Sequence, residues 1–186
     1  LMAAGRTVID IGEVPTPLVG CAGYHLNTGA GIAITGSHNP PDYNGLKTVI
    51  NHGPFWGDAI TDLSRRLRED DLVYGEGSTE SVDIRPAYQE KIQQGITLTR
   101  PLKVVVDCGN GVPGGLAPEL LQSLGAEVTP LYCEVDGQFP NHHPDPSLPE
   151  NLEDLIATVK AQAADVGIAF DGDGDRLGVV DEQGHI

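Results

Sequence analysis

Short apolar segments and helix-like segments follow one another along the chain, and this order restricts the possible folds most. The apolar runs Leu102–Val106 and Val166–Phe170 are typical of strands that are buried on both faces. Between them, Pro113–Leu124 has a helical pattern that Gly125 closes. Strands that alternate with helices favour mostly parallel or mixed sheets flanked by helices. We therefore expect an α/β protein.

The same alternation divides the chain into two consecutive α/β units. Residues 70–81 are acidic and contain Gly and Ser, which is typical of a linker, so the units are expected at residues 1–80 and 81–186. Both ends of the sequence look cut, and we expect the first unit to be truncated. Further strands are expected at Val8–Ile11, Gly31–Ile34, Leu46–Ile50, Glu127–Tyr132 and Leu177–Asp181, and further helices at Pro15–Leu26, Asp58–Arg68, Ile84–Ile96 and Pro149–Ala164.

Charge and cysteine content argue against several classes of function. The 27 acidic and 11 basic residues leave a formal charge of −16. We expect no nucleic acid or membrane partner, because binding the phosphates of a nucleic acid or an anionic lipid surface requires a Lys/Arg-rich surface. Cys21, Cys108 and Cys133 are odd in number and lack C-x-x-C spacing, so neither a disulfide framework nor a zinc site is indicated. A reducing, cytoplasmic location fits this pattern, and no apolar run approaches the length of a membrane span.

The segment Asp171-Gly172-Asp173-Gly174-Asp175-Arg176 is the sharpest chemical feature. Its three carboxylates at alternate positions fall on one side of an extended loop. The two glycines allow the backbone to bend so that the carboxylate oxygens converge. Like charges this close repel one another unless a cation lies among them, and oxygen ligands select Mg²⁺ or a similar divalent ion. The segment therefore predicts a metal loop.

Two other interpretations of this segment are weaker. An acidic surface turn would not need to follow directly after an apolar strand, where sites of α/β proteins usually lie. An EF-hand calcium loop would place Asp171 at position one and Glu182 at position twelve. Position six is then Arg176, where the EF-hand requires Gly, and the flanking segments resemble strands rather than helices.

A second polar loop, Thr35-Gly36-Ser37-His38-Asn39-Pro40, follows the apolar segment that ends at Ile34. A serine at the carboxyl end of a strand is at a usual site position, but its hydroxyl needs a base or a metal to react. His38 is adjacent, and Lys47 lies ten residues further on. A Ser-His-Asp hydrolase is disfavoured because the second Gly of a G-x-S-x-G elbow is missing. Taken alone, the loop is equally consistent with a structural turn.

Taken together, the two loops resemble those of a known family, the α-D-phosphohexomutases. Residues 35–40 resemble its active-serine loop and residues 171–176 resemble its metal loop, in the same order and at a similar separation. The segments Asp107-Cys108-Gly109-Asn110-Gly111 and Asn141-His142-His143-Pro144-Asp145-Pro146 resemble its second domain. The phosphomannomutase/phosphoglucomutase branch is the most similar. The phosphoglucosamine mutase branch typically carries Ala where this chain has Gly36 and Gly174.

The resemblance implies a reaction and a ligand set. Ser37 matches the serine that is carried phosphorylated, and one phosphoserine oxygen together with Asp171, Asp173 and Asp175 would hold Mg²⁺. The phosphoryl group would pass to a hexose phosphate substrate. The resulting hexose 1,6-bisphosphate would turn over and return its other phosphoryl group to the serine. The net reaction interconverts the 6-phosphate and the 1-phosphate of glucose or mannose.

The resemblance also implies supporting roles. Lys47 resembles the proton-transfer residue of the family, and it could act as a base only if its pKa were lowered. Arg176 matches a residue near the phosphoryl group, although a salt bridge within the acidic loop would also explain it. His38 and Asn39 are expected to orient the serine loop rather than to act as a base.

Other segments are less specific. Gly109-Asn110-Gly111 opens a helix and could cradle an anion, but a tight strand-to-helix turn explains it at least as well. The adjacent His142 and His143 point apart and are interpreted as loop residues. Phe55 and Trp56 are interpreted as packing residues.

The third and fourth domains of the family have no counterpart in this sequence. These domains carry the sugar-specificity loop and the phosphate-clamp loop. We therefore expect the 186 residues alone to have little mutase activity. Two alternatives stay open: a phosphoglucosamine mutase, or a non-catalytic module that binds a metal or a partner. The sequence indicates neither the oligomeric state nor the choice among glucose, mannose and glucosamine.

Overall fold

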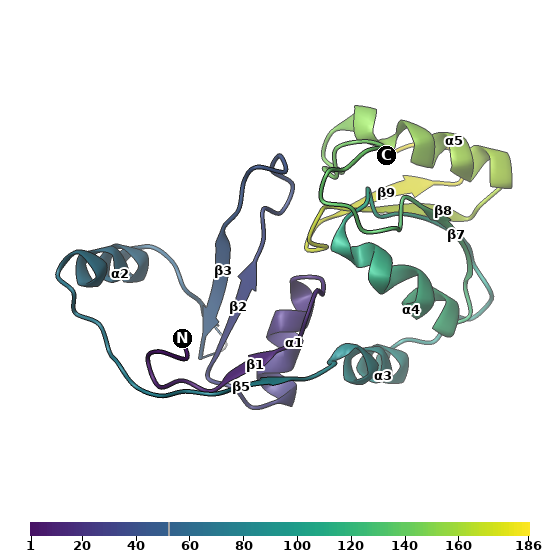
Figure 1. Cartoon of the computed structure of the whole chain (residues 1–186). Coiled ribbons are helices and arrows are strands. Elements are labelled where there is room, and N and C mark those ends of the chain that lie inside the picture. Colours follow the sequence, from purple (N-terminus) through teal and green to yellow (C-terminus); the bar gives the residue numbers. More distant parts are fainter. Residues whose placement is uncertain (52) are drawn as a thin grey trace.

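The computed structural model describes residues 1–51 and 53–186 and shows two units joined by an extended segment (Figure 1). The first unit contains two small sheets, and the second contains a four-stranded sheet with helices on both faces. The expected α/β class, with parallel and mixed sheets, is confirmed. Among the described residues, no helix is both long and apolar enough to cross a membrane.

The sheet of the second unit has the strand order β7-β6-β8-β9, with β6 at Lys103–Asp107, β7 at Glu127–Leu131, β8 at Val166–Phe170 and β9 at Leu177–Asp181. Strands β7, β6 and β8 are parallel, whereas β9 runs antiparallel to β8. A short connection can join β8 only to an antiparallel neighbour, because a parallel crossover needs a dozen residues or more. The loop 171–176 is therefore a hairpin between β8 and β9.

The apolar residues of β6 are buried on both faces of this sheet. Val105 packs with Leu155 and Val159 of α5 (Glu153–Gln162). Val104 and Val106 belong to a second cluster that contains Ala117 of α4 (Ala117–Ser123). Because successive side chains of a strand point to opposite faces, one apolar run supplies both cores.

Two expected helices are divided in the structure. The 3-10 helix η1 at Val112–Gly115 precedes α4, and η2 at Pro149–Leu152 precedes α5. Pro118 lies in the first turn of α4, and a proline ring there cannot continue a helix from the preceding turn. The single helix expected at Pro113–Leu124 is therefore wrong in its first part.

The first unit carries its strands in two separate sheets. In one, β2 (Ala30–Ile34), β3 (Leu46–Ile50) and the short β4 (Gly53–Pro54) form an antiparallel sheet. In the other, β1 (Val8–Asp10) pairs in parallel with β5 (Thr79–Ser81). The strand β5 lies in the segment that was predicted to be a linker. The local sequence does not reveal this strand, because its pairing partner β1 lies about 70 residues away.

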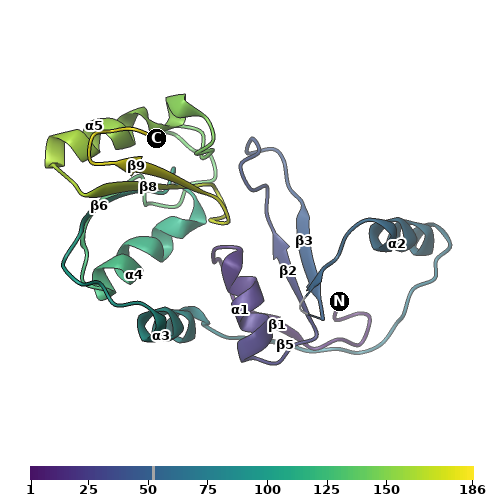
Figure 2. The same cartoon turned by 180° about the vertical axis from the view of Figure 1, so that it is seen from behind.

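The helices of the first unit differ in how they are packed. Helix α1 (Pro17–His25) packs against β2 and against α3 (Arg85–Gly95), which begins the second unit. Helix α2 (Asp58–Arg68) stands apart from the rest of the chain when seen from either side (Figures 1 and 2). Trp56, just before α2, is 72% exposed, so its interpretation as a packing residue is wrong.

Candidate active site

Three carboxylates meet in the hairpin between β8 and β9. One oxygen of each of Asp171, Asp173 and Asp175 lies within 4.8 Å of the others. Asp171 and Asp173 are buried, whereas Asp175 is exposed. Burial raises the pKa of Asp171, although the backbone N–H groups of Asp175 and Arg176 donate to its Oδ1 atom at 3.0 Å. The site thus holds negative charge in a place of limited solvation.

Ser37 is presented to these carboxylates by the loop between β2 and β3. Its Oγ atom lies 3.1 Å from Oδ2 of Asp171 and 3.3 Å from Oδ1 of Asp173. Ser37 has a φ of 54°, which is unusual for a residue other than glycine. Its backbone N–H donates to Oγ1 of Thr35 at 2.8 Å. A strained backbone that neighbouring groups hold in place is typical of functional positions.

Glycine allows the two loops to meet. A Cβ atom added to Gly172 would collide with the carbonyl oxygen of Ser37. Gly174 has a φ of +73°, and a Cβ atom there would also lie 2.8 Å from Pro113. The alternation of Asp and Gly that the sequence shows is therefore required by close backbone approach as well as by ligand spacing.

Lys47 lies on β3, directly opposite Ala33 of β2. Its Nζ atom lies 2.7 Å from Asp173, 2.6 Å from Asp175 and 3.4 Å from the Oγ atom of Ser37. Partial burial by itself would lower the pKa of Lys47, but the hydrogen bonds to Asp173 and Asp175 outweigh it and raise the pKa. The lysine is therefore protonated here, which is opposite to the state that a general base requires.

His38 and Arg176 form a chain of contacts that ends at the serine. The Nη1 atom of Arg176 lies 3.1 Å from Nε2 of His38, and Nδ1 of His38 lies 3.4 Å from the Oγ atom of Ser37. A guanidinium can only donate, so Nε2 accepts and the ring proton is on Nδ1, facing the serine. In this arrangement His38 orients Ser37 and does not take its proton. Asn39 donates its backbone N–H to the carbonyl oxygen of Gly36 at 2.9 Å and thereby closes the turn.

Two threonines that were not among the predicted site residues also belong to the site. The hydroxyls of Thr16 and Thr35 donate to Oδ2 of Asp173 at 2.7 and 3.0 Å, and the backbone N–H of Thr16 donates to the carbonyl oxygen of Asp173 at 2.8 Å. Burial by itself would raise the pKa of Asp173, but these donors and Lys47 lower it. The position of Thr16 between Pro15 and Pro17, at the start of α1, was the available signal.

The turn after β6 is structural in this conformation. The backbone N–H groups of Gly109, Asn110 and Gly111 donate to Asp107, Tyr132 and Cys108 respectively, so they are not directed at an anion.

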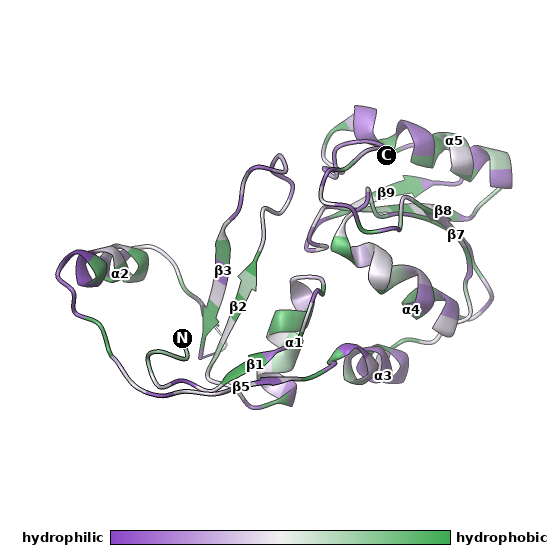
Figure 3. Ribbon diagram, in the orientation of Figure 1, coloured by the Kyte–Doolittle hydropathy of each residue, from purple (hydrophilic) through white to green (hydrophobic). Residues whose placement is uncertain are grey.

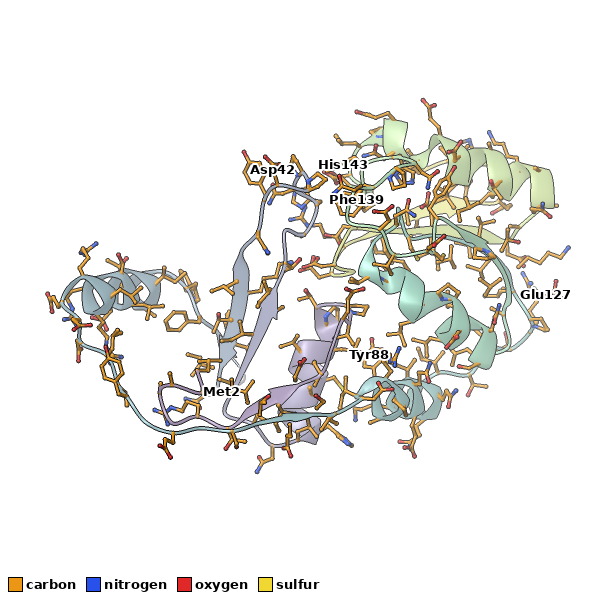
Figure 4. All side chains as sticks on the ribbon, in the orientation of Figure 1. Met2, Asp42, Tyr88, Glu127, Phe139 and His143 are labelled. Carbon is orange, nitrogen blue, oxygen red and sulfur yellow. The ribbon has the colours of Figure 1, made fainter. Side chains whose placement is uncertain are left out.

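His142 is more than a loop residue, since its Nε2 atom lies 3.0 Å from Oδ2 of Asp107, whose side chain is completely buried. Figure 4 shows the tip of the β2–β3 hairpin, marked by Asp42, reaching towards the loop that carries Phe139 and His143.

The donor set fits a hard divalent cation. Three carboxylates and a serine oxygen converge from two loops, and such oxygen ligands are those that Mg²⁺ prefers. Within residues 1–51 and 53–186, Lys47 is the only residue that forms ion pairs with these carboxylates.

Six site residues predicted from the sequence come together through their side chains, namely Ser37, His38, Lys47, Asp171, Asp173 and Asp175. Arg176 joins them through His38, and Asn39 through the backbone of the turn.

Two family models match the chain. Residues 1–71 match domain I and residues 86–184 match domain II of phosphoglucomutase/phosphomannomutase, both described as alpha/beta/alpha domains. The whole chain is 55% identical to a phosphomannomutase/phosphoglucomutase of Pseudomonas aeruginosa and 48% identical to a phosphoglucomutase of Neisseria gonorrhoeae. It spans 40% and 41% of the lengths of these two relatives.

A solved structure gives the same result for the fold. The crystal structure of a phosphoglucomutase/phosphomannomutase family protein from Burkholderia thailandensis superimposes with a TM-score of 0.94 at 49% identity. The match covers 100% of this chain and 42% of that one. Both units, in this relative arrangement, thus resemble part of a solved protein.

Proposed function

The chain belongs to the phosphoglucomutase/phosphomannomutase family, and from this premise we propose that the protein is a Mg²⁺-dependent phosphohexomutase. It interconverts the 6-phosphate and the 1-phosphate of glucose or mannose. The observation that carries the proposal is the position of the Ser37 hydroxyl, 3.1 Å and 3.3 Å from the buried carboxylates of Asp171 and Asp173. A hydroxyl held against two carboxylates is suited to carry a phosphoryl group only if positive charge is also present.

Ser37 is the proposed phosphoryl carrier, and Asp171, Asp173 and Asp175 are the proposed metal ligands. Mg²⁺ bound there would neutralise charge on the phosphoryl group and on its leaving oxygen. Arg176 fixes the tautomer of His38, which in turn orients the serine. Lys47 holds a proton 3.4 Å from the Ser37 oxygen, so it is placed to give a proton to that oxygen when the phosphoryl group leaves.

The proposed reaction has two transfers. The phosphoserine gives its phosphoryl group to the free hydroxyl of a hexose phosphate, and hexose 1,6-bisphosphate forms. This molecule reorients without leaving and returns its other phosphoryl group to Ser37. Since phosphoryl transfer depends mainly on positioning and charge, a serine fixed by its strained backbone suits both directions.

The first test is the covalent state of the serine. Protein purified from its natural host is expected to carry one phosphate on Ser37, detected by intact mass and peptide sequencing. Replacement of Ser37 by Ala in the complete protein should lower turnover of glucose 1-phosphate and mannose 1-phosphate by at least about 1,000-fold.

The matched control is Ser123→Ala, because the Ser123 hydroxyl donates to the carbonyl oxygen of Leu120 within the last turns of α4. This variant should retain full activity. Activity of Ser37→Ala equal to that of Ser123→Ala would refute the mechanism. Faster turnover of glucosamine 1-phosphate than of glucose 1-phosphate and mannose 1-phosphate would assign the protein to the phosphoglucosamine mutase branch instead.

We also propose that the 186 residues alone turn over little substrate. In this chain the serine and the carboxylates lie on loops, and Asp175 is exposed, so a transferred phosphoryl group there would remain open to water. The measurement compares the 186-residue chain with the complete protein in the same assay. Equal rates would contradict the proposal, and slow release of inorganic phosphate from a phosphorylated chain would support it.

A further inference from the structure

Two cysteines far apart in sequence lie side by side at the end of the central sheet. The Sγ atoms of Cys108 and Cys133 are 3.5 Å apart. Cys108 directly follows β6 and Cys133 follows β7 by two residues, so the pairing of the two strands brings them together. A disulfide bond requires about 2.05 Å between the sulfurs, so closure needs a movement of roughly 1.5 Å.

The backbone holds both residues in this position. The N–H group of Cys108 donates to the carbonyl oxygen of Leu131 at 3.1 Å. On the other side, the carbonyl of Cys133 lies so close to Gly114 that a Cβ atom there would collide with it. The backbone positions of the two cysteines therefore follow from strand pairing and packing.

The two thiols differ in burial and acidity. Cys108 is completely buried, whereas Cys133 is only partly buried. The contact with Cys108 lowers the pKa of Cys133, while the same contact and burial raise the pKa of Cys108. The less buried thiol of Cys133 is thus the one whose pKa is lowered, and thiolates are the form that oxidants attack.

We propose that Cys108 and Cys133 form a redox-active dithiol site that small peroxides convert reversibly into a disulfide. The thiolate of Cys133 attacks one peroxide oxygen, the O–O bond breaks and water is released, which leaves Cys133 as a sulfenic acid. The sulfur of Cys108 then attacks the sulfur of Cys133, the S–O bond breaks and a second water leaves. Two thiols lose two electrons and two protons, and hydrogen peroxide becomes two molecules of water.

This disulfide would form next to the candidate active site. The turn that begins at Cys108 continues to Val112, whose N–H group donates to the carbonyl oxygen of Gly172 at 3.1 Å. A Cβ atom on Gly111 would lie 2.7 Å from that same oxygen, so the turn and the metal loop are in tight contact. The proposal concerns the thiols and does not depend on mutase activity.

The test uses the complete reduced protein, treated with hydrogen peroxide and then with iodoacetamide under denaturing conditions. A protease that cleaves after glutamate separates the two cysteines, because Glu119 and Glu127 lie between them. We expect a disulfide-linked peptide pair that disappears on treatment with dithiothreitol, while Cys21 remains alkylated. Recovery of Cys108 as the alkylated thiol after Cys133 has been oxidised would overturn the proposal.

A second measurement distinguishes resolution by Cys108 from simple oxidation of Cys133 alone. The sulfenic acid at Cys133 should be trapped by dimedone at least about tenfold more in Cys108→Ala than in the unmodified protein, because nothing resolves it in the variant. Cys21→Ser, the matched control, should leave both the linked pair and the dimedone yield unchanged. Equal dimedone yields with and without Cys108 would refute the proposal.

Discussion

The two units differ in how completely they bury their apolar side chains. In the second unit, clusters on both faces of the sheet contain fully buried residues such as Val105, Val106 and Leu155. In the first unit, α2 has no buried residue, and the face of the β2–β3 sheet that carries Ile34 and Leu46 is exposed. Figure 3 shows apolar segments on β2, β3 and α2 without a covering layer.

This difference shows where the precision of the site comes from. The carboxylates are attached to a closed core, whereas Ser37 is delivered by a hairpin with one open face. The position of Ser37 therefore depends on its contacts with the second unit, through Gly172, Asp171 and Asp173. Four predictions test this comparison, from the largest expected effect to the smallest.

The largest effect is expected from a pair of leucines, one in each unit. Leu155→Ala removes a fully buried side chain from the second unit and should lower the free energy of unfolding by about 2–5 kcal/mol, because it leaves a cavity. Leu63→Ala, on the exposed stripe of α2, should change it by less than about 0.5 kcal/mol. Urea denaturation measures both, and equal effects would contradict the comparison.

The second-largest effect is expected from a change at the contact between the two units. Gly172→Ala places a Cβ atom against the carbonyl oxygen of Ser37 and should push the two loops apart. A displacement of this kind lowers activity by about 100-fold, because reacting groups lose their alignment. The assay uses the complete protein. Gly20→Ala is the control, since its added Cβ atom in α1 meets nothing within 4 Å, and it should retain activity. Full activity of Gly172→Ala would show that the loops need no close approach.

A smaller effect is expected from the pair formed by His142 and Asp107. The hydrogen bond to Asp107 raises the pKa of His142 above its ordinary value of 6.5, and Asp154 acts in the same direction. The charged pair therefore stabilises the second unit fully below about pH 6.5, and this stabilisation is lost as pH rises through the higher pKa of the folded state. Replacement of His142 by Asn should lower the free energy of unfolding by roughly 1.5–3 kcal/mol at pH 6 and by less at pH 8.

Its control is His143→Asn, because that ring packs edge-on against Phe139 and its own side chain makes no recorded ion pair among the described residues. Urea denaturation at several pH values should give parallel curves for this control and the unmodified protein. A pH profile of His142→Asn that also parallels the unmodified protein would count against the charged pair.

The smallest effect is expected on α2. Arg65 bridges Asp62 and Glu69 along one face of this helix, but all three groups are exposed. Exposed ion pairs contribute little because solvent and salt screen them. Arg65→Ala should leave the urea midpoint unchanged within error. A clear decrease would show that α2 is coupled to the rest of the chain more tightly than its exposure indicates.

Local pattern was sufficient for much of the fold and for the choice of site residues. Asp58–Arg68 and Leu46–Ile50 have the same bounds in the structure as in the expectation from sequence. Helical spacing and apolar runs reflect interactions within a few residues, so they can be read directly. The serine and carboxylate loops could be linked because their residue types and order resemble those of one family.

The tertiary structure alone decided how these residues meet. It paired β5 with β1, placed Thr16 on Asp173, joined His142 to Asp107 and put Cys133 beside Cys108. It also placed Lys47 between two carboxylates, which raises its pKa rather than lowering it. Each of these contacts joins residues at least 25 positions apart, and a pairing over such a distance depends on how strands and loops pack, which the local sequence does not encode.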